Sequence, residues 1–401
     1  MCKTPLRFTL RAIRFRLYPT PNQEQQLLEH CAHARFVWNL ALEQASMYRR
    51  HLGPTPSHVT RCKQLTEARA EFGWLGAGSA IVQQQALRDF DQAMRNFWAG
   101  THRYPSWRKA RLHEGFRSVQ TGPQHVRRLN RRWAEVFILK VGWVRFRWTR
   151  PLSDFRSFRV KRERTGQWFV AFAVIPPAIA GPGDGSVVGL DRGVATSLAL
   201  STGELLSCPM PDKRRLSVAK RRLDKTMPGS RRRDRRRRRV ARVMARERRQ
   251  RRDWVEKTST RLASSFDVIR VENLIVPAMV RSAHGTVDAP GRKVAQKAGL
   301  NRLILASGWG ALVSRLEDKA PGRVQRIDPA FTSRACSVCG HVDAKSRKSQ
   351  AVFACTTCGN TDHADVNAAK NIAAGHAVRA RGAGAQSGPA KNREPQLANA
   401  S

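Results

Sequence analysis

Four cysteines in the last quarter of the sequence have the spacing of a metal site. Cys336 and Cys339, and then Cys355 and Cys358, form two C-x2-C pairs that fifteen residues separate. Each two-residue gap places its pair of thiolates on a tight turn, and this spacing is typical of one tetrahedral zinc ion. Disulfides are the alternative, but the other four cysteines are scattered singly along the chain. Four thiolates fill the coordination sphere of zinc, so we expect its role to be structural.

Three acids occupy positions where carboxylates can gather. Asp191 ends the apolar stretch 186–190, Glu272 ends the apolar stretch 266–271, and Asp365 opens an Ala/Asn-rich helix. Alone, Asp191 fits a strand-end cap or an ion-pair partner, since a buried acid is unfavourable unless it is paired or bound to a cation. The repeated pattern favours another interpretation: if the two strands are parallel neighbours, their terminal carboxylates meet at the C-terminal edge of the sheet.

Three carboxylates at one place repel each other, and divalent cations that prefer oxygen ligands relieve the repulsion. Two Mg²⁺ ions about 4 Å apart can activate a water and stabilise the leaving oxygen of a phosphodiester. The three acids therefore predict a site for metal-dependent hydrolysis of nucleic acid.

The charge of the chain points to a polyanionic partner. Its 401 residues include 74 Lys and Arg against 30 Asp and Glu, which gives a formal net charge of +44, and 41% of the residues are apolar. Such a surplus is self-repulsive unless a polyanion neutralises it, and nucleic acid fits this role. No apolar run reaches the length of a membrane span, and residues 1–16 hold no continuous apolar segment. We expect a cytoplasmic protein that keeps its thiols reduced.

The most basic segment, residues 212–252, holds 21 Lys or Arg and four acids in 41 residues. A thin apolar stripe at helical spacing, broken at Pro228-Gly229, predicts two helices that pack on the sheet through the stripe and turn their outer faces to phosphates. The stripe comprises Leu216, Val218, Ala219, Leu223, Val240, Val243 and Met244. A localisation signal or a solvated run is the alternative.

The remaining segments predict the elements around these sites. Residues 11–18 alternate like a strand, helical spacing recurs over 22–51, 57–72 and 79–98, and residues 115–177 return to strand-like alternation. We interpret the alternating segments as a small barrel or curled sheet. Its basic residues, interleaved with tryptophans, suit phosphate contact and base stacking, although each tryptophan alone fits a core position. Residues 302–319 predict one amphipathic helix, and 323–327 a last strand.

These motifs together resemble the TnpB family of transposon-encoded, RNA-guided DNA endonucleases, which is related to the miniature type V CRISPR effectors. The resemblance rests on GLDRGVATSLALSTGE, DVIRVENL, FTSRACSVCG and DHADVNAAKNI, and it extends over residues 11–375. It implies a multidomain α/β and all-β fold in which a split ribonuclease-H/RuvC-like nuclease with an inserted zinc ribbon follows a wedge β-barrel containing a helical insert. Many relatives carry an Asp-Arg pair directly before the third acid, whereas this chain carries His363-Ala364 there.

The resemblance also implies domain boundaries. We expect the wedge barrel at 1–20 and 111–180, the helical recognition insert at 21–110, the nuclease at 181–327 and 361–375 with a basic helical rod at 212–262, the zinc ribbon at 328–360, and a disordered tail at 376–401.

The function implied is cleavage of double-stranded target DNA next to a short flanking motif, directed by a guide RNA. Asp191 is expected to bridge two Mg²⁺ ions, with Glu272 and Asp365 holding one each, and one structural Zn²⁺ is expected on the four cysteines. The resemblance places the protein in a prokaryotic cytoplasm without requiring an oligomer or a membrane. The alternatives are a miniature type V CRISPR effector, a non-cleaving RNA-guided repressor, and a nuclease or transposase that uses no guide.

Basic residues of the sheet, the rod and the first knuckle are the predicted contacts to nucleic acid. They are Arg127, Arg128, Arg131, Arg132, Lys140, Arg145, Arg147, Arg231, Arg232, Arg235, Arg236, Arg246 and Arg334.

Overall fold

The computed structural model describes residues 10–47, 55–119, 123–193, 196–286 and 289–375. The chain forms two compact units: residues 1–178 with 211–252, and residues 179–210 with 253–401. Both units are discontinuous in sequence, because the segment 211–252 leaves the second unit and joins the first. The predicted tail at 376–401 lies outside the described residues.

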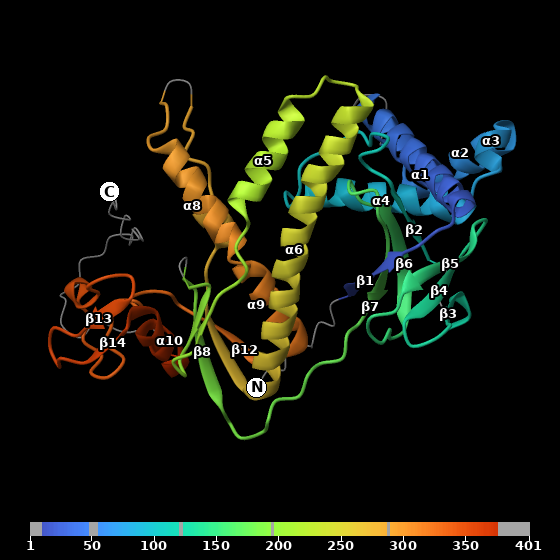
Figure 1. The fold of residues 1–401 in the computed structure, drawn as a ribbon. Helices are drawn as coiled ribbons and strands as arrows, with labels where there is room; N and C mark the ends of the chain where they lie inside the picture. The colour runs from blue at the N-terminus through green and yellow to red at the C-terminus, as the bar shows by residue number, and fades with distance from the viewer. Residues whose placement is uncertain (1–9, 48–54, 120–122, 194–195, 287–288, 376–401) are drawn as a thin grey trace. The chain divides into compact units, whose positions relative to one another are not determined.

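A seven-stranded antiparallel sheet organises the first unit (Figure 1). Along the sheet the strands are β2 (Gly115–Ser118), β6 (Phe155–Arg162), β7 (Trp168–Val174), β1 (Arg11–Leu17), β5 (Gly142–Arg147), β4 (Trp133–Ile138) and β3 (Val126–Arg128). The N-terminal strand is thus central, and Arg11 pairs with Val174 and Leu17 with Trp168. Its alternating pattern buries Phe15 and Leu17 on one face, as the sequence predicts for a half-exposed strand.

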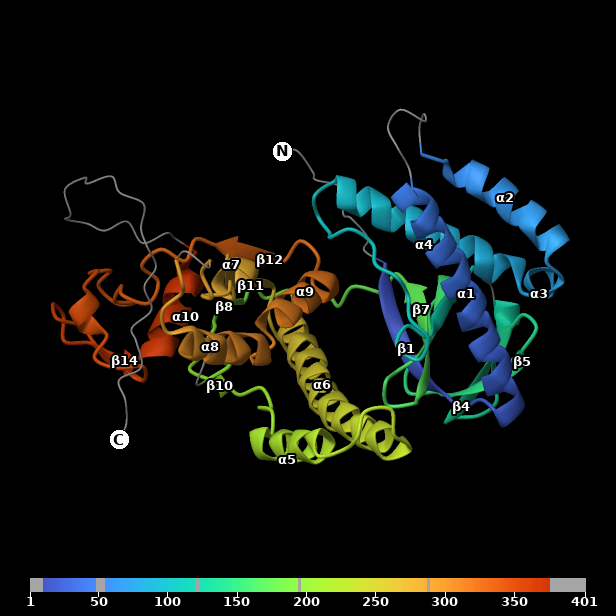
Figure 2. The same ribbon diagram turned by 90° about the horizontal axis from the view of Figure 1, so that it is seen from above.

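Helices cover one side of this sheet and complete its core. They are α1 (Pro21–Met47), α2 (His58–Glu71), the short α3 (Gly73–Gly76) and α4 (Ala80–Trp98), and a 3-10 turn, η2, spans Pro123–His125. The three long helices confirm the predicted helices, and α1 packs along α4 (Figure 2). Phe90 of α4 and Phe146 and Phe172 of the sheet are fully buried in one continuous core, which excludes water between the helices and the strands.

The arginine-rich segment folds as a helical hairpin. Helix α5 (Lys213–Asp224) and helix α6 (Arg231–Ser265) are separated at Pro228-Gly229, where Gly229 has a φ of 81°, so the two predicted helices are confirmed. The prediction that the stripe from Leu216 to Met244 packs on the sheet is wrong. In the described residues, the core of the second unit's sheet includes Val255 and Leu262 of α6 but no residue of that stripe.

A five-stranded sheet organises the second unit, in the order β10 (Leu205–Leu206), β9 (Leu198–Leu200), β8 (Val187–Asp191), β11 (Val268–Glu272) and β12 (Val324–Ile327). Strands β8, β11 and β12 are parallel, whereas β9 and β10 are antiparallel to their neighbours. The parallel strands are distant in sequence, and long helical segments connect them, as parallel pairing requires.

Helices α9 (Trp309–Lys319) and α10 (Ala364–Ala374) pack against this sheet. Helix α9 inserts Trp309, Leu312 and Leu316 into the sheet core, and α10 lies against β8. The prediction of a single helix over 302–319 is wrong. Helix α8 (Val294–Ala306) ends within this range, and α9 begins after Gly308, whose φ of 73° interrupts the helical backbone. A short helix, α7 (Val276–Met279), follows β11.

The cysteine-rich segment between β12 and α10 contains little regular structure. Strands β13 (Val352–Ala354) and β14 (Thr361–His363) form a two-stranded hairpin, and a 3-10 turn, η3, covers Ala344–Ser346. Within the described part of the chain, none of the helices combines the length and apolar character that a membrane crossing requires.

Candidate active site and metal centre

Asp191 and Glu272 end two neighbouring parallel strands, as the sequence predicts. Asp191 is the last residue of β8, and Glu272 is the last of β11. The strands are in register up to the pair Leu190 and Val271, directly before the two acids. Parallel strands that end together present their terminal side chains at the same edge of the sheet, which is the usual ligand edge of an open α/β sheet.

Asp365 reaches the same site from helix α10. It lies in the first turn of the helix, where its backbone N–H donates to Nδ1 of His363, the N-cap residue. The helix approaches β8 closely at Gly189, because a Cβ atom there would lie 2.0 Å from the carbonyl oxygen of Ala369. The absence of a side chain at Gly189 thus permits the contact that brings Asp365 beside Asp191.

The three carboxylates interact electrostatically. Asp191 is 8% exposed and Asp365 is 4% exposed. Burial raises the pKa of Asp191 well above its usual value, and the negative charges of Glu272 and Asp365 raise it further. Ionising all three acids is therefore unfavourable without a compensating cation.

Two further side chains hold the acids, and sequence reasoning missed both. Arg347 donates from Nη2 to Oδ1 of Asp365 at 2.9 Å, and its charge opposes the rise in the pKa of Asp191. Thr332, which is buried, donates from Oγ1 to Oε1 of Glu272 at 2.6 Å. Thr332 lies within the FTSRAC motif, which could have pointed to it. Nothing in the sequence distinguishes Arg347 from the basic residues around it.

The four cysteines form a compact cluster. Their sulfur atoms all lie within 4.8 Å of one another, and among the described residues they are the one group of three or more His, Cys, Asp or Glu ligands gathered tightly enough for a single ion. The three acids interact electrostatically but are not gathered as tightly as this. Sγ of Cys336 is 3.7 Å from Sγ of Cys358, and Sγ of Cys339 is 3.6 Å from that of Cys355. A tetrahedron with metal–sulfur bonds of about 2.3 Å has edges of about 3.8 Å, so these separations fit one four-coordinate metal ion.

Backbone groups prepare the cluster for a cation. The backbone N–H of Cys358 donates to Sγ of Cys355 and, with other hydrogen bonds, lowers the pKa of that thiol to about 6. A thiolate is the form that binds a metal ion. The N–H groups therefore favour the thiolate of Cys355, whereas contacts with the other sulfur atoms raise the pKa of Cys358 to about 12.

Two asparagines of α10 join the helix to the first knuckle. Nδ2 of Asn367 donates to the carbonyl oxygen of Ala335 at 2.7 Å, and Oδ1 of Asn367 accepts from the backbone N–H of Ser337. Nδ2 of Asn371 donates to the carbonyl oxygens of Ala335 and Thr332. These bonds explain why the NAAKNI sequence of the helix and the knuckle sequence occur together: the asparagines satisfy the backbone of the knuckle.

The predicted nucleic-acid contacts have differing surroundings. Arg127 bonds Glu135 at 2.8 Å and stacks over Trp143, while Arg147 lies over the ring of Trp133. Lys140 donates to the carbonyl oxygens of Ala77 and Gly78, so its ammonium group joins the sheet to the helices and is less available for phosphate.

The other predicted contacts lie at the surface. Arg131 and Arg132 are exposed in the turn before β4, and Arg334 is exposed beside the first knuckle. Arg232, Arg235 and Arg236 line a cavity between α5 and α6, whereas Arg231 and Arg246 are exposed and are not among the residues that line it. Arg128 and Arg145 are exposed on the sheet of the first unit.

Comparison with known proteins supports the arrangement. Models described as "Helix-turn-helix domain", "Probable transposase" and "Cas12f1-like, TNB domain" match residues 9–52, 169–283 and 309–372. A solved Cas12f1–sgRNA–target DNA complex contains a chain with the same fold, at a TM-score of 0.55 and 14% identity, covering 88% of this chain and 82% of the other. The fold is thus that of a Cas12f1-type protein.

Two curated relatives match almost from end to end. One is "Putative RNA-guided DNA endonuclease InsQ" of Escherichia coli K12, which is 33% identical over 96% of this chain and 97% of the relative. The other is "Putative RNA-guided DNA endonuclease" of Streptomyces pristinaespiralis, which is 31% identical over 93% of this chain and 91% of the relative. The chain belongs to the TnpB family.

Proposed function

We propose that this protein is an RNA-guided, divalent-metal-dependent DNA endonuclease of transposon origin. The convergence of Asp191, Glu272 and Asp365 carries the proposal. Two lie at the ends of adjacent parallel strands, and all three interact closely enough to raise the pKa of Asp191. The end-to-end relatives, which are named as RNA-guided DNA endonucleases, support it.

The surroundings of the acids fit Mg²⁺. Their donors are carboxylate oxygens, which Mg²⁺ prefers, and a divalent cation relieves the repulsion that Glu272 and Asp365 exert on the buried Asp191. Asp191, Glu272 and Asp365 would hold two ions. Bound there, Mg²⁺ supplies a nucleophilic water and charge stabilisation for the phosphodiester.

The chain's own residues orient this site. The hydroxyl of Thr332 fixes one carboxylate oxygen of Glu272. Arg347 neutralises Asp365 and holds its carboxylate in place. The N-cap bond at His363 and the close packing at Gly189 position the helix that carries Asp365. Fixed groups of this kind reduce the reorganisation that the reaction needs.

The finer architecture follows the same assignment. We assign the sheet β10-β9-β8-β11-β12 with α10 to a split ribonuclease-H/RuvC-like nuclease, at 181–327 and 361–375. The cysteine cluster belongs to a zinc ribbon at 328–360, with Cys336, Cys339, Cys355 and Cys358 as ligands. The seven-stranded sheet of the first unit is the wedge barrel, at 1–20 and 111–180, and α1 to α4 form the recognition insert at 21–110. The order of the parallel and antiparallel strands in the smaller sheet supports this assignment.

A guide RNA and double-stranded target DNA are the proposed partners. The formal charge of +44 and the exposed arginines of the first unit support contact with phosphates. The extent of the likeness favours a transposon origin over a CRISPR effector. A Cas12f1 of Sulfoacidibacillus thermotolerans is 48% identical but over only 14% of this chain, whereas the transposon-type relatives match nearly all of it.

Substitution of Asp191 by Ala tests the catalytic assignment. We expect cleavage of a plasmid bearing the target to fall by roughly 10³-fold or more, the size of effect seen when a group that stabilises developing charge is removed. RNA binding should remain unchanged. Asp253→Asn is the control, because Asp253 is an exposed acid that pairs with Lys257 on the same helix. Cleavage by the Asp191 variant at the wild-type rate would refute the site.

The RNA that co-purifies with the protein tests guidance. Sequencing should return one discrete species from the DNA that flanks the gene, and changing its guide segment should move the cut. Heterogeneous RNA combined with unguided cleavage would instead indicate a structure-selective nuclease.

A further inference from the structure

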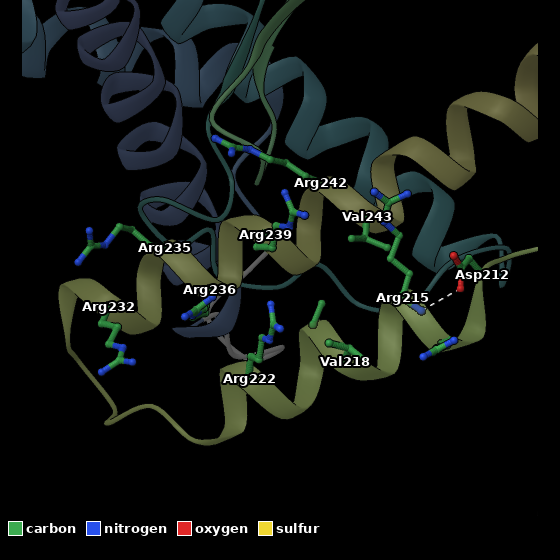
Figure 3. A pocket seen from close by; sticks show the side chains of 12 residues that line it. Asp212, Arg215, Val218, Arg222, Arg232, Arg235, Arg236, Arg239, Arg242 and Val243 are labelled. Atoms are coloured by element: carbon green, nitrogen blue, oxygen red, sulfur yellow. Dashed lines mark hydrogen bonds between the residues drawn. The ribbon is translucent and has the colours of Figure 1, made fainter.

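The helical hairpin of the first unit contains a cavity lined by arginines. The cavity has a volume of about 810 Å³ and lies between α5 and α6. Eight arginines and one acid, Asp212, line it, with Val218, Ala219 and Val243 as its apolar wall. Figure 3 shows the side chains of Arg215 and Arg222 extending from α5 toward α6. The sequence predicted phosphate contacts on the outer faces of these helices, but the structure places many of the arginines on the inner side.

The hairpin is built to hold this arrangement. Ala219 and Val243 are each 8% exposed, so the two helices share a small apolar contact region. At the turn, Arg233 donates to the carbonyl oxygens of Leu223 and Thr226, and the hydroxyl of Ser230 accepts from the backbone N–H of Arg233. A cation bound to the last carbonyls of α5 closes that helix end. The turn therefore fixes the direction in which α6 returns along α5.

The charges of the cavity arginines are largely unpaired in the part of the chain that the structure describes. In the described part of the chain, no ion pair involves any of the eight, and the carboxylate of Asp212 accepts from the backbone N–H of Arg215 to cap α5. Like charges this close repel each other and weaken the hairpin when it is alone. An anion between the helices would convert this repulsion into attraction.

The arrangement of the guanidinium groups indicates a linear polyanion. Arg235, Arg239 and Arg242 follow the i, i+4, i+7 spacing of one helical face, and Arg215 and Arg222 follow the i, i+7 spacing of another. The row on α6 thus places charges at intervals of about one helical turn, 5.4 Å, and the two arginines of α5 lie about two turns apart. A single small anion would engage one end of such rows. The cavity has the volume of a small-ligand pocket and is too small for a double helix.

We propose that the cavity between α5 and α6 binds the phosphodiester backbone of a single RNA strand, and that RNA binding locks the hairpin closed. This inference rests on the proposed function, in which guide RNA is the permanent partner. The arginines of the two helices repel one another, so the hairpin needs an anion bound at all times. Guide RNA can fill this role, whereas target DNA is present only during cleavage. The strand is bound through phosphates, so the site reads no sequence.

Matched triple variants test the proposal in the full chain. The cavity variant changes Arg215, Arg222 and Arg239 to Gln; the control changes Lys220, Arg221 and Arg238 to Gln. Both remove two charges from α5 and one from α6, but the control residues are exposed and do not line the cavity. The probes are the co-purifying RNA, resynthesised, and a single-stranded DNA of the same sequence. Affinity is measured across salt concentrations, and hydrogen exchange of α5 is measured with and without each probe.

Loss of three phosphate contacts should lower RNA affinity roughly 50-fold at 0.15 M salt and reduce the salt slope by about 2. The control should change affinity only a few-fold. RNA should slow exchange in α5 of the wild type and of the control, but not of the cavity variant.

Equal losses in the two variants would overturn the inference and leave the proposed function standing if guided cleavage persists. Protection of α5 by the DNA probe but not by the RNA would overturn the assignment to RNA. A wild-type protein that binds no discrete RNA would overturn both the inference and the proposed function.

Discussion

The two charged regions of this molecule follow opposite rules. At the carboxylate site, three acids are positioned by strand ends, a helix N-terminus and hydrogen bonds from Thr332 and Arg347. In the α5–α6 hairpin, eight arginines line one cavity and none has an acid partner among the described residues. A reaction centre needs a few groups held at fixed positions, whereas a phosphate-binding surface needs charge density. The acid site should therefore be sensitive to position, and the hairpin to the number of charges.

The largest combined effect on stability and cleavage is expected from a methyl group added next to the acid site. In Gly189→Ala, the Cβ atom would meet the carbonyl oxygen of Ala369 at 2.0 Å and the backbone nitrogen of Ala373 at 2.4 Å. Helix α10 must move, so we expect about 3 kcal/mol of lost stability and cleavage reduced by about 10²-fold as Asp365 shifts. Chemical denaturation and cleavage assays measure both.

Gly310→Ala is the control for this substitution, because Gly310 lies in helix α9 with no atom within 4 Å of its Cβ position. It should leave both quantities nearly unchanged. A Gly189→Ala protein of normal stability would show that the close packing of α10 on β8 is unnecessary.

Charge-conserving substitutions sharpen the contrast between the two regions. Asp191→Glu keeps the charge but lengthens the side chain, and we expect cleavage to fall by about 10²-fold because a displacement of about 1 Å suffices for such a loss. Arg222→Lys with Arg239→Lys keeps the charge in the hairpin, and RNA affinity should stay within about threefold of wild type. If the double lysine variant lowers RNA affinity by as large a factor as Asp191→Glu lowers cleavage, the hairpin also depends on side-chain geometry. The two regions would then not differ in this respect.

The smallest effect is the change in stability that we expect for the Asp191→Asn variant. Asp191→Asn removes a buried charge that its two acidic neighbours repel, so the variant should be about 1–2 kcal/mol more stable at pH 8 in the presence of a chelator. The folded-state pKa of Asp191 is raised, so wild-type stability falls as pH rises through the interval between the unfolded and folded pKa values. The difference between the proteins should therefore vanish below about pH 4. Thermal unfolding at several pH values measures it, and a gain that persists in acid would contradict this origin.

Much of the acid site could be predicted from sequence because it depends on short-range patterns. An apolar stretch that ends in an acid occurs at both Asp191 and Glu272, and parallel pairing of β8 with β11 was the only further assumption required. Arg347 could not be found in this way. Its ion pair with Asp365 depends on how the cysteine-rich segment folds back over eighteen positions of sequence, which no local period encodes.

The errors in the fold also have physical causes. The helical spacing of 302–319 continues through Ser307-Gly308, and the positive φ that ends the helix at Gly308 leaves no mark on the apolar pattern. The stripe of α5 and α6 identifies one apolar face, but such a face can pack on a sheet or on another helix equally well. The sequence therefore indicated two helices without indicating what they pack against.

The carbonyl oxygen of Ala335 accepts hydrogen bonds from both Asn367 and Asn371. This single backbone atom lies directly before Cys336 and connects the cysteine cluster to the helix that carries Asp365. Under the proposed assignment the two metal sites are coupled, since the turn that carries Cys336 also presents the carbonyl oxygen that anchors the helix. Loss of a zinc ion that takes no part in hydrolysis would then disturb the helix that carries Asp365. Nuclease activity would fall without a change in any catalytic residue.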